Sequence, residues 1–334
     1  MKPMNSFMPT VQESLQLSVV IPIYNEEKNI FNLYDRLTGV MQTLGEPYEF
    51  IFVNDGSRDN SLALIKTLSQ RDEKVRFINF SRNFGHQIAV SAGLDHTRGK
   101  AIVIIDADLQ DPPELIIDLY KKMQEGFEVV YARRRKRVGE SYLKLLTAKW
   151  FYRILANITS VEIPVDTGDF RIMSDKIVQV LRNMPERNKF LRGQISWAGF
   201  KQIFVEYDRA ERAEGETGYT YRKMIRFALD GITSFSDFPL KVATMSGFVV
   251  SGIAFLVMLY ALYSRFVSHD TVPGWTSTIL SVLFLGGIQL ISIGIIGEYI
   301  SRISNNVRGR PLYIISDTNV ETKPDTMPQH AQVF

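Results

Sequence analysis

Two carboxylates two residues apart, followed by an amide, form the strongest chemical signal in the sequence. Asp106, Asp108 and Gln110 come directly after the apolar run 102–105, where a strand would end and the chain would turn. Oxygen ligands suit a hard divalent cation such as Mg²⁺ or Mn²⁺, and a metal held from one side keeps positions open for phosphate oxygens. The alternative is an acidic turn that caps a helix starting near Pro112.

Polar side chains also follow the first two apolar runs. Tyr24, Asn25 and Glu26 lie where the run Leu17–Ile23 opens into a loop, and Asp55 follows the second run. An aromatic ring, an amide and carboxylates are suited to holding a nucleobase and a ribose. Each residue taken singly has a simpler explanation, because such residues often cap a helix or form a bare turn.

Short apolar runs that alternate with helical patterns would position these side chains. Strands joined by crossover helices in a largely parallel sheet have this alternation, so we predict an α/β fold. Open sheets of this kind bind ligands beyond the carboxyl ends of their strands, where every polar motif above lies. The runs cover residues 17–23, 48–54, 75–80, 101–105 and 128–131, and the clearest helical patterns cover residues 29–44 and 112–124.

Composition narrows the classes of function. The 334 residues are enough for a catalytic domain and an appendage. With 39 Lys and Arg against 36 Asp and Glu, the net charge of +3 gives no reason to expect a nucleic-acid partner. The chain has no cysteine, which excludes disulfides and thiolate metal sites and agrees with a cytoplasmic location. Residues 1–16 are polar, do not resemble a secretion signal and are predicted to be flexible.

Two long uncharged stretches indicate a membrane hairpin after a catalytic domain at residues 17–240. Each stretch exceeds the roughly 20 residues that cross a bilayer, so we predict transmembrane helices at about 242–264 and 274–298. Basic residues flank the pair and are scarce in its connecting loop. The positive-inside rule therefore predicts that the catalytic domain and both termini are cytoplasmic. The segment 301–334 should end in a polar, disordered tail from Glu321.

Two further segments, around 140–160 and 221–237, are predicted to be amphipathic helices at the membrane surface. The first mixes aromatic and aliphatic residues with Lys149 and Arg153, which lie four residues apart and hence on one helical face. A helix packed on the domain core is the alternative interpretation.

Together these motifs resemble the family 2 glycosyltransferases, whose nucleotide-sugar-binding fold is the Rossmann-like GT-A fold. Within that family the chain is most similar to polyprenyl-phosphate glycosyltransferases, which include dolichyl-phosphate mannose synthases and bacterial undecaprenyl-phosphate glucosyltransferases of the O-antigen type. The resemblance runs from about residue 17 to residue 315. It includes Gly-Asp-Phe-Arg at 168–171, the two spans and a closing Arg-Pro-Leu-Tyr at 310–313.

The resemblance implies a role for each candidate residue. The donor nucleotide would be lined by Pro22, Tyr24, Glu26, Asp55 and Asp106. Mg²⁺ or Mn²⁺ would be bound by Asp106, Asp108 and Gln110. The catalytic residues would be Asp108 and Asp169, with Asp169 beside the reacting sugar. The acceptor phosphate would need cations, for which the candidates are Arg133, Lys149, Arg153, Arg209 and Arg212.

Arg209 and Arg212 are candidates because this sequence departs from the family pattern at Gly218. Many relatives carry a lysine at the position of Gly218, so Arg209 or Arg212 is expected to supply that charge. For the run at 133–137 and for Lys149 and Arg153, contact with anionic lipid headgroups or a merely solvated face is the alternative.

The implied reaction moves glucose from UDP-glucose to undecaprenyl phosphate with inversion, at the cytoplasmic face of the plasma membrane. A phosphate monoester has its second pKa near about 6, so its oxygen attacks without a strong base. Asp169 would then orient the acceptor or steady the developing positive sugar, or it would only bond Arg171 within a loop.

Other readings of the reaction and its partners stay open at this stage. The donor could be GDP-mannose or a UDP-aminosugar, and the protein could be a processive polysaccharide synthase or a non-catalytic membrane scaffold. Glycine-rich spans are compatible with a homo-oligomer. The resemblance also implies a downstream flippase and a lumenal glycosyltransferase as functional partners.

Overall fold

The computed structural model describes residues 15–135, 167–208, 236, 238–263, 274–320 and 331–333. These residues belong to two compact units, which we describe separately. One unit is an α/β domain and the other is a pair of long helices. The predicted surface helices at 140–160 and 221–237 fall outside the described residues, except for Ser236.

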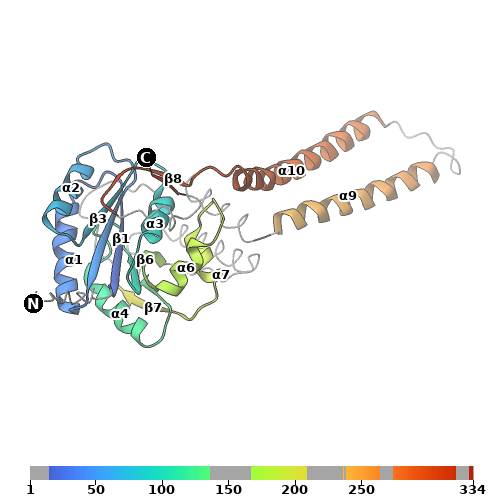
Figure 1. Cartoon of the computed structure of the whole chain (residues 1–334). Helices are drawn as coiled ribbons and strands as arrows, with labels where there is room; N and C mark the ends of the chain where they lie inside the picture. Colours follow the sequence, from blue (N-terminus) through green and yellow to red (C-terminus); the bar gives the residue numbers. More distant parts are fainter. Residues whose placement is uncertain are drawn as a thin grey trace, which may run out of the picture. The chain divides into compact units, whose positions relative to one another are not determined.

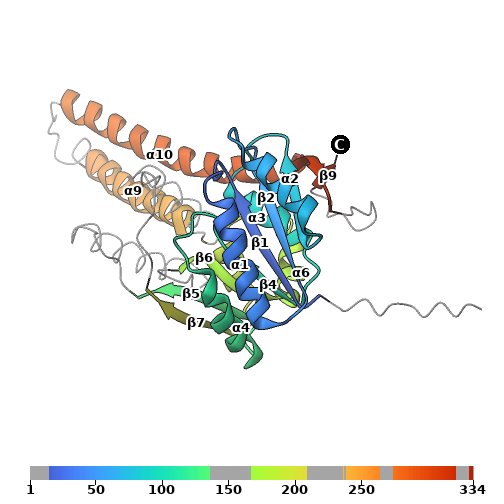
Figure 2. The same ribbon diagram turned by 90° about the vertical axis from the view of Figure 1, so that its left-hand side faces the viewer.

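The α/β unit is built on a mixed sheet whose described strands lie in the order β7-β5-β6-β4-β1-β2-β3-β8-β9 (Figures 1 and 2). β1 to β4 are parallel, as the sequence predicts. β6 runs antiparallel to both β4 and β5, and β8 runs antiparallel to β3. The strands are β1 (Leu17–Ile23), β2 (Tyr48–Asn54), β3 (Val75–Phe80), β4 (Ala101–Ile104), β5 (Val129–Arg134), β6 (Thr167–Ser174), β7 (Gln202–Tyr207), β8 (Tyr313–Thr318) and β9 (Ala331–Val333).

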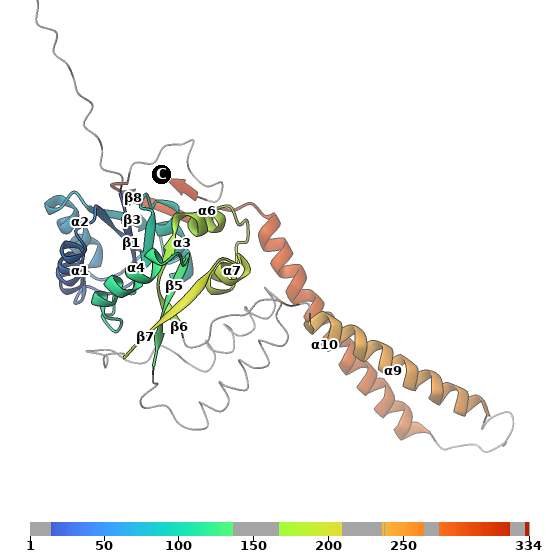
Figure 3. The same ribbon diagram turned by 90° about the horizontal axis from the view of Figure 1, so that it is seen from below.

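Helices cover both faces of this sheet, because the central strands bury side chains on both sides. In β1, Val19 and Ile21 pack toward one face and Val20 toward the other. The first face is covered by α1, α2, η1 and α4, and the second by α3, α6 and α7 (Figure 3). These elements are α1 (Ile30–Leu44), α2 (Ser61–Arg71), α3 (His86–Asp95), η1 (Pro113–Leu115), α4 (Ile116–Gln124), α6 (Asp175–Arg182) and α7 (Leu191–Trp197).

The C-terminal segment joins the sheet, which the sequence did not predict. β8 lies beside β3, and β9 pairs with β8 in parallel. Tyr313 and Ile315 of β8 are fully buried against Ile78 and Phe80 of β3. The expectation of a disordered tail from Glu321 onward therefore does not hold for Ala331–Val333.

A buried ionic network lies at the end of the sheet opposite the strand termini that carry the polar motifs. Glu49 of β2 is 1% exposed. Its carboxylate accepts a 2.7 Å hydrogen bond from Ser18 and a two-pronged contact from Arg98, whose Nη2 lies 2.8 Å away. Arg76 adds a second cation at 3.3 Å. A buried carboxylate held in this way stabilises the fold only while its partners are complete.

Replacing Glu49 by alanine is expected to destabilise the protein by about 1–3 kcal/mol, because the buried Ser18 and the largely buried Arg76 lose a partner, whereas Arg98 is 47% exposed and stays solvated. Thermal unfolding of the purified chain in detergent measures the effect. Glu114→Ala is the control, since its ion pair with Arg36 is exposed and worth no more than about 1 kcal/mol. Equal melting temperatures for the two variants would contradict this assignment.

The second unit consists of two apolar helices, α9 (Phe238–Tyr263) and α10 (Trp275–Val307), which pack side by side (Figure 1). Two windows in them, Phe238–Val257 and Phe284–Val307, are long and apolar enough to cross a membrane, with mean hydropathies of 1.8 and 1.4. The Tyr299 hydroxyl donates a 2.7 Å hydrogen bond to the carbonyl of Ser236. The predicted spans at about 242–264 and 274–298 thus correspond to these helices, although α10 continues to Val307.

Candidate active site

The loop after β4 turns sharply and carries the predicted carboxylates. Leu109 has a φ of 57°, a left-handed conformation that bends the chain between Asp108 and Gln110. The Asp108 carboxylate accepts a 3.1 Å hydrogen bond from the Gln110 backbone N–H. Gln110 is buried, whereas Asp106 keeps 32% of its side chain exposed. The turn therefore leaves Asp106 and Asp108 at the edge of the sheet.

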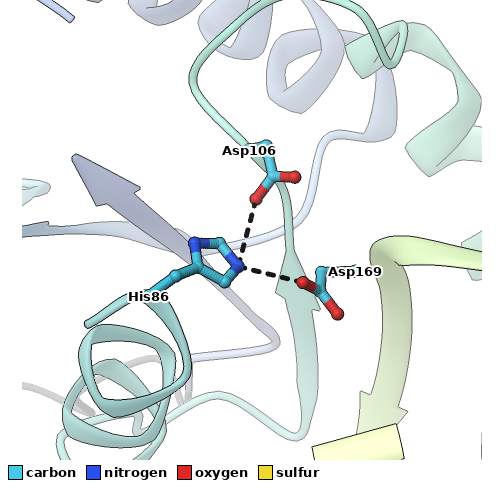
Figure 4. A group of neighbouring side chains, drawn as sticks. All are labelled: His86, Asp106 and Asp169. Carbon is cyan, nitrogen blue, oxygen red and sulfur yellow. Dashed lines mark hydrogen bonds and ion pairs between the residues drawn. The ribbon is translucent and has the colours of Figure 1, made fainter. Parts of the chain in front are cut away.

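His86, at the start of α3, lies between Asp106 and Asp169 (Figure 4). Its Nε2 donates a 3.0 Å hydrogen bond to Oδ2 of Asp169 and lies 3.6 Å from Oδ1 of Asp106. Burial alone would lower the pKa of His86, but the two carboxylates raise it to about 9. At neutral pH the imidazole is therefore a cation between two acidic groups.

Asp169 lies on β6 and is surrounded by donors. Its Oδ1 accepts hydrogen bonds from Arg171 at 2.9 Å and from Arg192 at 3.3 Å. Its Oδ2 accepts from His86 and, at 3.3 Å, from the Gln87 side chain. Burial alone would raise the pKa of Asp169, but Arg192, His86 and Arg171 hold it well below its usual range. Asp169 is thus an anion at neutral pH, and both of its oxygens accept hydrogen bonds.

The pKa of Asp106 is shifted upward, in contrast to that of Asp169. Burial raises its pKa to about 6, the charge of His86 opposes that shift, and Asp169 adds to it. The Oδ1 atom of Asp106 is buried and has no hydrogen-bond partner. One ligand atom from each of His86, Asp106 and Asp169 lies within 4.8 Å of the others. Because His86 is protonated and four side chains donate to Asp169, the Asp106 oxygen that lacks a hydrogen bond is the atom of this group that fits a divalent cation.

Asp55 follows β2 and fixes the neighbouring loop. Its carboxylate accepts hydrogen bonds from the backbone N–H groups of Phe84, at 2.6 Å, and Gly85, at 3.0 Å. Burial raises the pKa of Asp55, and these two donors partly offset the rise. Gly56 has a φ of 65°, and a Cβ there would lie 2.5 Å from the backbone of Arg82. The turn that carries Asp55 therefore requires glycine.

The remaining candidates near the end of β1 differ in exposure. Pro22 is buried within the strand, whereas Tyr24 is 45% exposed beyond it. Glu26 accepts a 2.7 Å hydrogen bond from the Asn29 side chain, and its backbone N–H donates to Ser61. Of these three residues, Tyr24 offers the most open surface to a ligand.

Arg133 and Arg134, neighbours on β5, engage different partners. Arg133 forms an ion pair with Glu206 on β7 and stacks on Phe204. Arg134 lies 3.5 Å from the buried carboxylate of Asp111, in the loop that carries Asp106 and Asp108. A Cβ on Gly168 would lie 3.1 Å from Nη2 of Arg134, so this glycine makes room for the guanidinium beside Asp169.

The structure therefore brings Asp106, Asp108 and Asp169 to one edge, with Asp55 linked to them through the loop that leads to His86. It gives Arg133 a partner on β7 and brings Arg134 to the site. Lys149, Arg153, Arg209 and Arg212 lie outside the described residues.

Sequence reasoning missed four side chains at this edge: His86, Gln87, Arg192 and Arg134. His86 and Gln87 had a usable signal, since they follow the third apolar run at the same sheet edge as the recognised motifs. Arg192 had none, because it opens a short helix whose position depends on long-range packing.

Comparison with known proteins gives a consistent result over almost the whole chain. Residues 18–182 match the family described as Glycosyl transferase family 2, and residues 238–303 match the one described as GtrB C-terminal hairpin. The chain is 49% identical to the uncharacterized glycosyltransferase YkcC of Bacillus subtilis (strain 168), covering 95% of this chain and 98% of that protein.

Two further relatives carry more specific names. The prophage bactoprenol glucosyl transferase homolog of Escherichia coli (strain K12) is 42% identical over 90% of this chain and 98% of its own length. The SfII prophage-derived bactoprenol glucosyl transferase of Shigella flexneri is also 42% identical, over 91% of this chain and 99% of its own length.

Proposed function

Because the chain belongs to glycosyltransferase family 2, we propose that it transfers glucose from UDP-glucose to a polyprenyl phosphate such as undecaprenyl phosphate, with inversion. The observation that carries this proposal is the 42% identity, over both the sheet and the helical pair, to proteins named bactoprenol glucosyl transferases. A processive polysaccharide synthase is not favoured, since those relatives match this chain over nearly their full length.

The proposed cofactor is Mg²⁺ or Mn²⁺, held by Asp106 and Asp108 with Gln110 nearby. The orphaned Oδ1 of Asp106 supports this assignment. When bound, the ion would offset the negative charge that builds up on the departing nucleoside diphosphate. His86 places a positive charge 3.6 Å from this same Oδ1 atom of Asp106.

Binding of Mn²⁺ to the purified chain is expected to weaken as the pH falls through about 6. Asp106 must be ionised to ligate a metal, and its raised pKa of about 6 means that protons compete in that range. Titration with Mn²⁺ between pH 5 and 8, followed by electron paramagnetic resonance, measures this effect. A constant affinity across that interval would argue against Asp106 as a ligand.

Asp169 is proposed to orient cationic groups beside the sugar and not to act as a base. A carboxylate has about four lone-pair sites, and four side chains already donate to this one. The acceptor phosphate needs no base, because it is already anionic near neutral pH. Asp169 bonds Arg171, and it also holds Arg192 and His86 in place. That Asp169 itself orients the acceptor or steadies the positive sugar stays a prediction.

Arg134 is the proposed acceptor-phosphate contact from the basic run, in place of Arg133. Alanine at Arg134 is expected to raise the KM for polyprenyl phosphate by about 10-fold or more, the loss of one charge-assisted hydrogen bond. Arg133→Ala is the matched control, because its partner Glu206 lies on β7 and not in the loop that carries Asp106 and Asp108, and the KM of this variant should change less than about threefold. Steady-state kinetics at fixed lipid composition compare the two, and the reverse order would restore Arg133.

The proposed location is the plasma membrane, crossed by α9 and α10, with the α/β unit and both termini in the cytoplasm. The distribution of basic residues around the two spans supports this orientation. The product would then require a flippase and a lumenal glycosyltransferase to use its sugar.

The decisive experiment offers the purified chain a panel of nucleotide sugars with undecaprenyl phosphate, with and without a chelator. We expect UDP-glucose to give a lipid product whose mass is that of the acceptor plus one hexose, and we expect the chelator to suppress it. Preference for a GDP-sugar, or for water as the acceptor, would refute the proposed function.

A further inference from the structure

β8, the strand that follows the helical pair along the chain, lies beside β3 and contacts the loops that hold the proposed donor site. The backbone N–H of Ser81, the first residue after β3, donates a 3.0 Å hydrogen bond to the carbonyl of Ile314 in β8. The loop from Ser81 to Gly85 then reaches Asp55 and leads into His86. β8 therefore borders the segment that connects two site residues.

A chain of side-chain hydrogen bonds runs from β8 to the turn that carries Asp55. The Asn79 amide donates to the Ser316 hydroxyl at 2.7 Å, and its carbonyl oxygen accepts from the Asn54 amide at 2.7 Å. Asn54 is 1% exposed, and its oxygen accepts a 3.4 Å contact from the backbone N–H of Ser57. The amides therefore link β8 to both sides of Asp55, across β3.

Aromatic packing provides a second connection. The fully buried ring of Tyr313 stacks on Phe80 with centroids 5.2 Å apart. Phe80 meets Phe84 edge-on at 5.5 Å, and the Phe84 backbone N–H donates to the Asp55 carboxylate. The Tyr313 hydroxyl also donates to Asp95, the last residue of α3, whose first residue is His86.

We propose that β8 positions the donor-binding loops, so that the segment after the membrane hairpin is a functional part of the nucleotide site. This inference rests on the proposed function only in taking Asp55 as a nucleotide contact. It makes Tyr313 and Ser316 positioning residues, which act through Phe84 and Asn54 without contacting the substrate.

If β8 only stabilises the sheet, substitutions at either of its ends should affect the loops around Asp55 equally. Substitutions at the Thr318 end therefore test this alternative. Thr318 donates a hydrogen bond from its hydroxyl to the carbonyl of Phe77, at the start of β3. Val320 is buried in the apolar cluster that also contains Tyr313 and Ile315. Thr318→Val removes a hydroxyl at the last residue of β8, and Val320→Ala removes buried apolar contact two residues beyond it. They are the controls for Ser316→Ala and Tyr313→Leu.

The experiment uses full-length variants in detergent, with two readouts: hydrogen–deuterium exchange of peptides covering residues 54–57 and 81–86, and UDP affinity in the presence of Mn²⁺ by calorimetry. We expect faster exchange in both peptides for Ser316→Ala and Tyr313→Leu. UDP affinity should fall about threefold for the first and about tenfold for the second. Both controls should stay within about twofold of the parent, because neither Thr318 nor Val320 takes part in the aromatic contacts of Phe80 or in the hydrogen bonds of Asn79.

Exchange in these two peptides that is unchanged, or that rises equally in tests and controls, would overturn the inference. If Tyr313→Leu does not fold, Ser316→Ala decides the question, since it removes a single hydroxyl from an exposed position. A parent protein that binds no UDP would sink the proposed donor, while the exchange comparison would still decide the role of β8.

Discussion

Replacing Asp106 by asparagine is expected to lower glucosyl transfer by about 10³-fold while leaving the melting temperature unchanged or raised. The loss follows from removing a charged ligand that would stabilise the departing diphosphate, an electrostatic contribution typically worth about 10²–10³-fold in turnover. The retained stability follows from the raised pKa of Asp106, because above about pH 6 the folded state holds an ionised carboxylate that its buried surroundings disfavour.

These opposite effects separate a catalytic role from a structural one. Turnover is measured with radiolabelled UDP-glucose and unfolding by intrinsic fluorescence in the same detergent. Asp118→Asn, an exposed carboxylate on α4, is the control and should change neither quantity. Undiminished transfer by Asp106→Asn, or by the parent protein in excess chelator, would remove the basis of the metal assignment.

Asp169→Asn is expected to lower turnover by about 10²-fold or more and also to destabilise the protein by about 3–5 kcal/mol. The amide cannot balance Arg171, which is 1% exposed and would become an uncompensated buried charge. Arg192 and His86 would lose the anion that holds them at the site. UDP affinity should fall less than turnover, since Asp169 bonds His86 but neither Asp55 nor its partners Phe84 and Gly85.

Asp175→Asn provides the comparison, because Asp175 is the first residue of α6 and its carboxylate accepts a hydrogen bond from Gln179 of the same helix. It should retain turnover within about twofold. Full turnover by Asp169→Asn at saturating donor would show that Asp169 only anchors Arg171. A loss confined to stability, with normal rates for the folded fraction, would lead to the same conclusion.

The local pattern of the sequence was enough to predict the central sheet and one edge of the site. β1, β2 and β4 are mostly apolar because both of their faces are buried, and such runs are visible without a structure. Parallel strands end at a common edge, so Asp55, Asp106 and Asp108 could be assigned to one place from their order alone. The two apolar stretches likewise predicted α9 and α10 from length and composition.

Which side chains lie next to these carboxylates could be learned only from the tertiary structure. Asp169 reaches His86, 83 positions away in the chain, because β6 inserts antiparallel beside β4. Arg192 reaches the same carboxylate only because α7 packs on that face of the sheet. No local periodicity encodes these pairings, since they depend on which strand lies beside which.

The tertiary structure also distinguishes two adjacent arginines of β5. Arg133 and Arg134 are equivalent in the sequence, but successive side chains of a strand point to opposite faces, and only the strand register sends Arg134 toward Asp111 and Arg133 toward Glu206. β8 was not predicted because its closest contacts lie more than 200 residues away along the chain, on β3. The sequence predicted the parallel strands, the two long apolar helices and the acidic residues at one edge of the sheet. Long-range packing decided which charged side chains pair with one another.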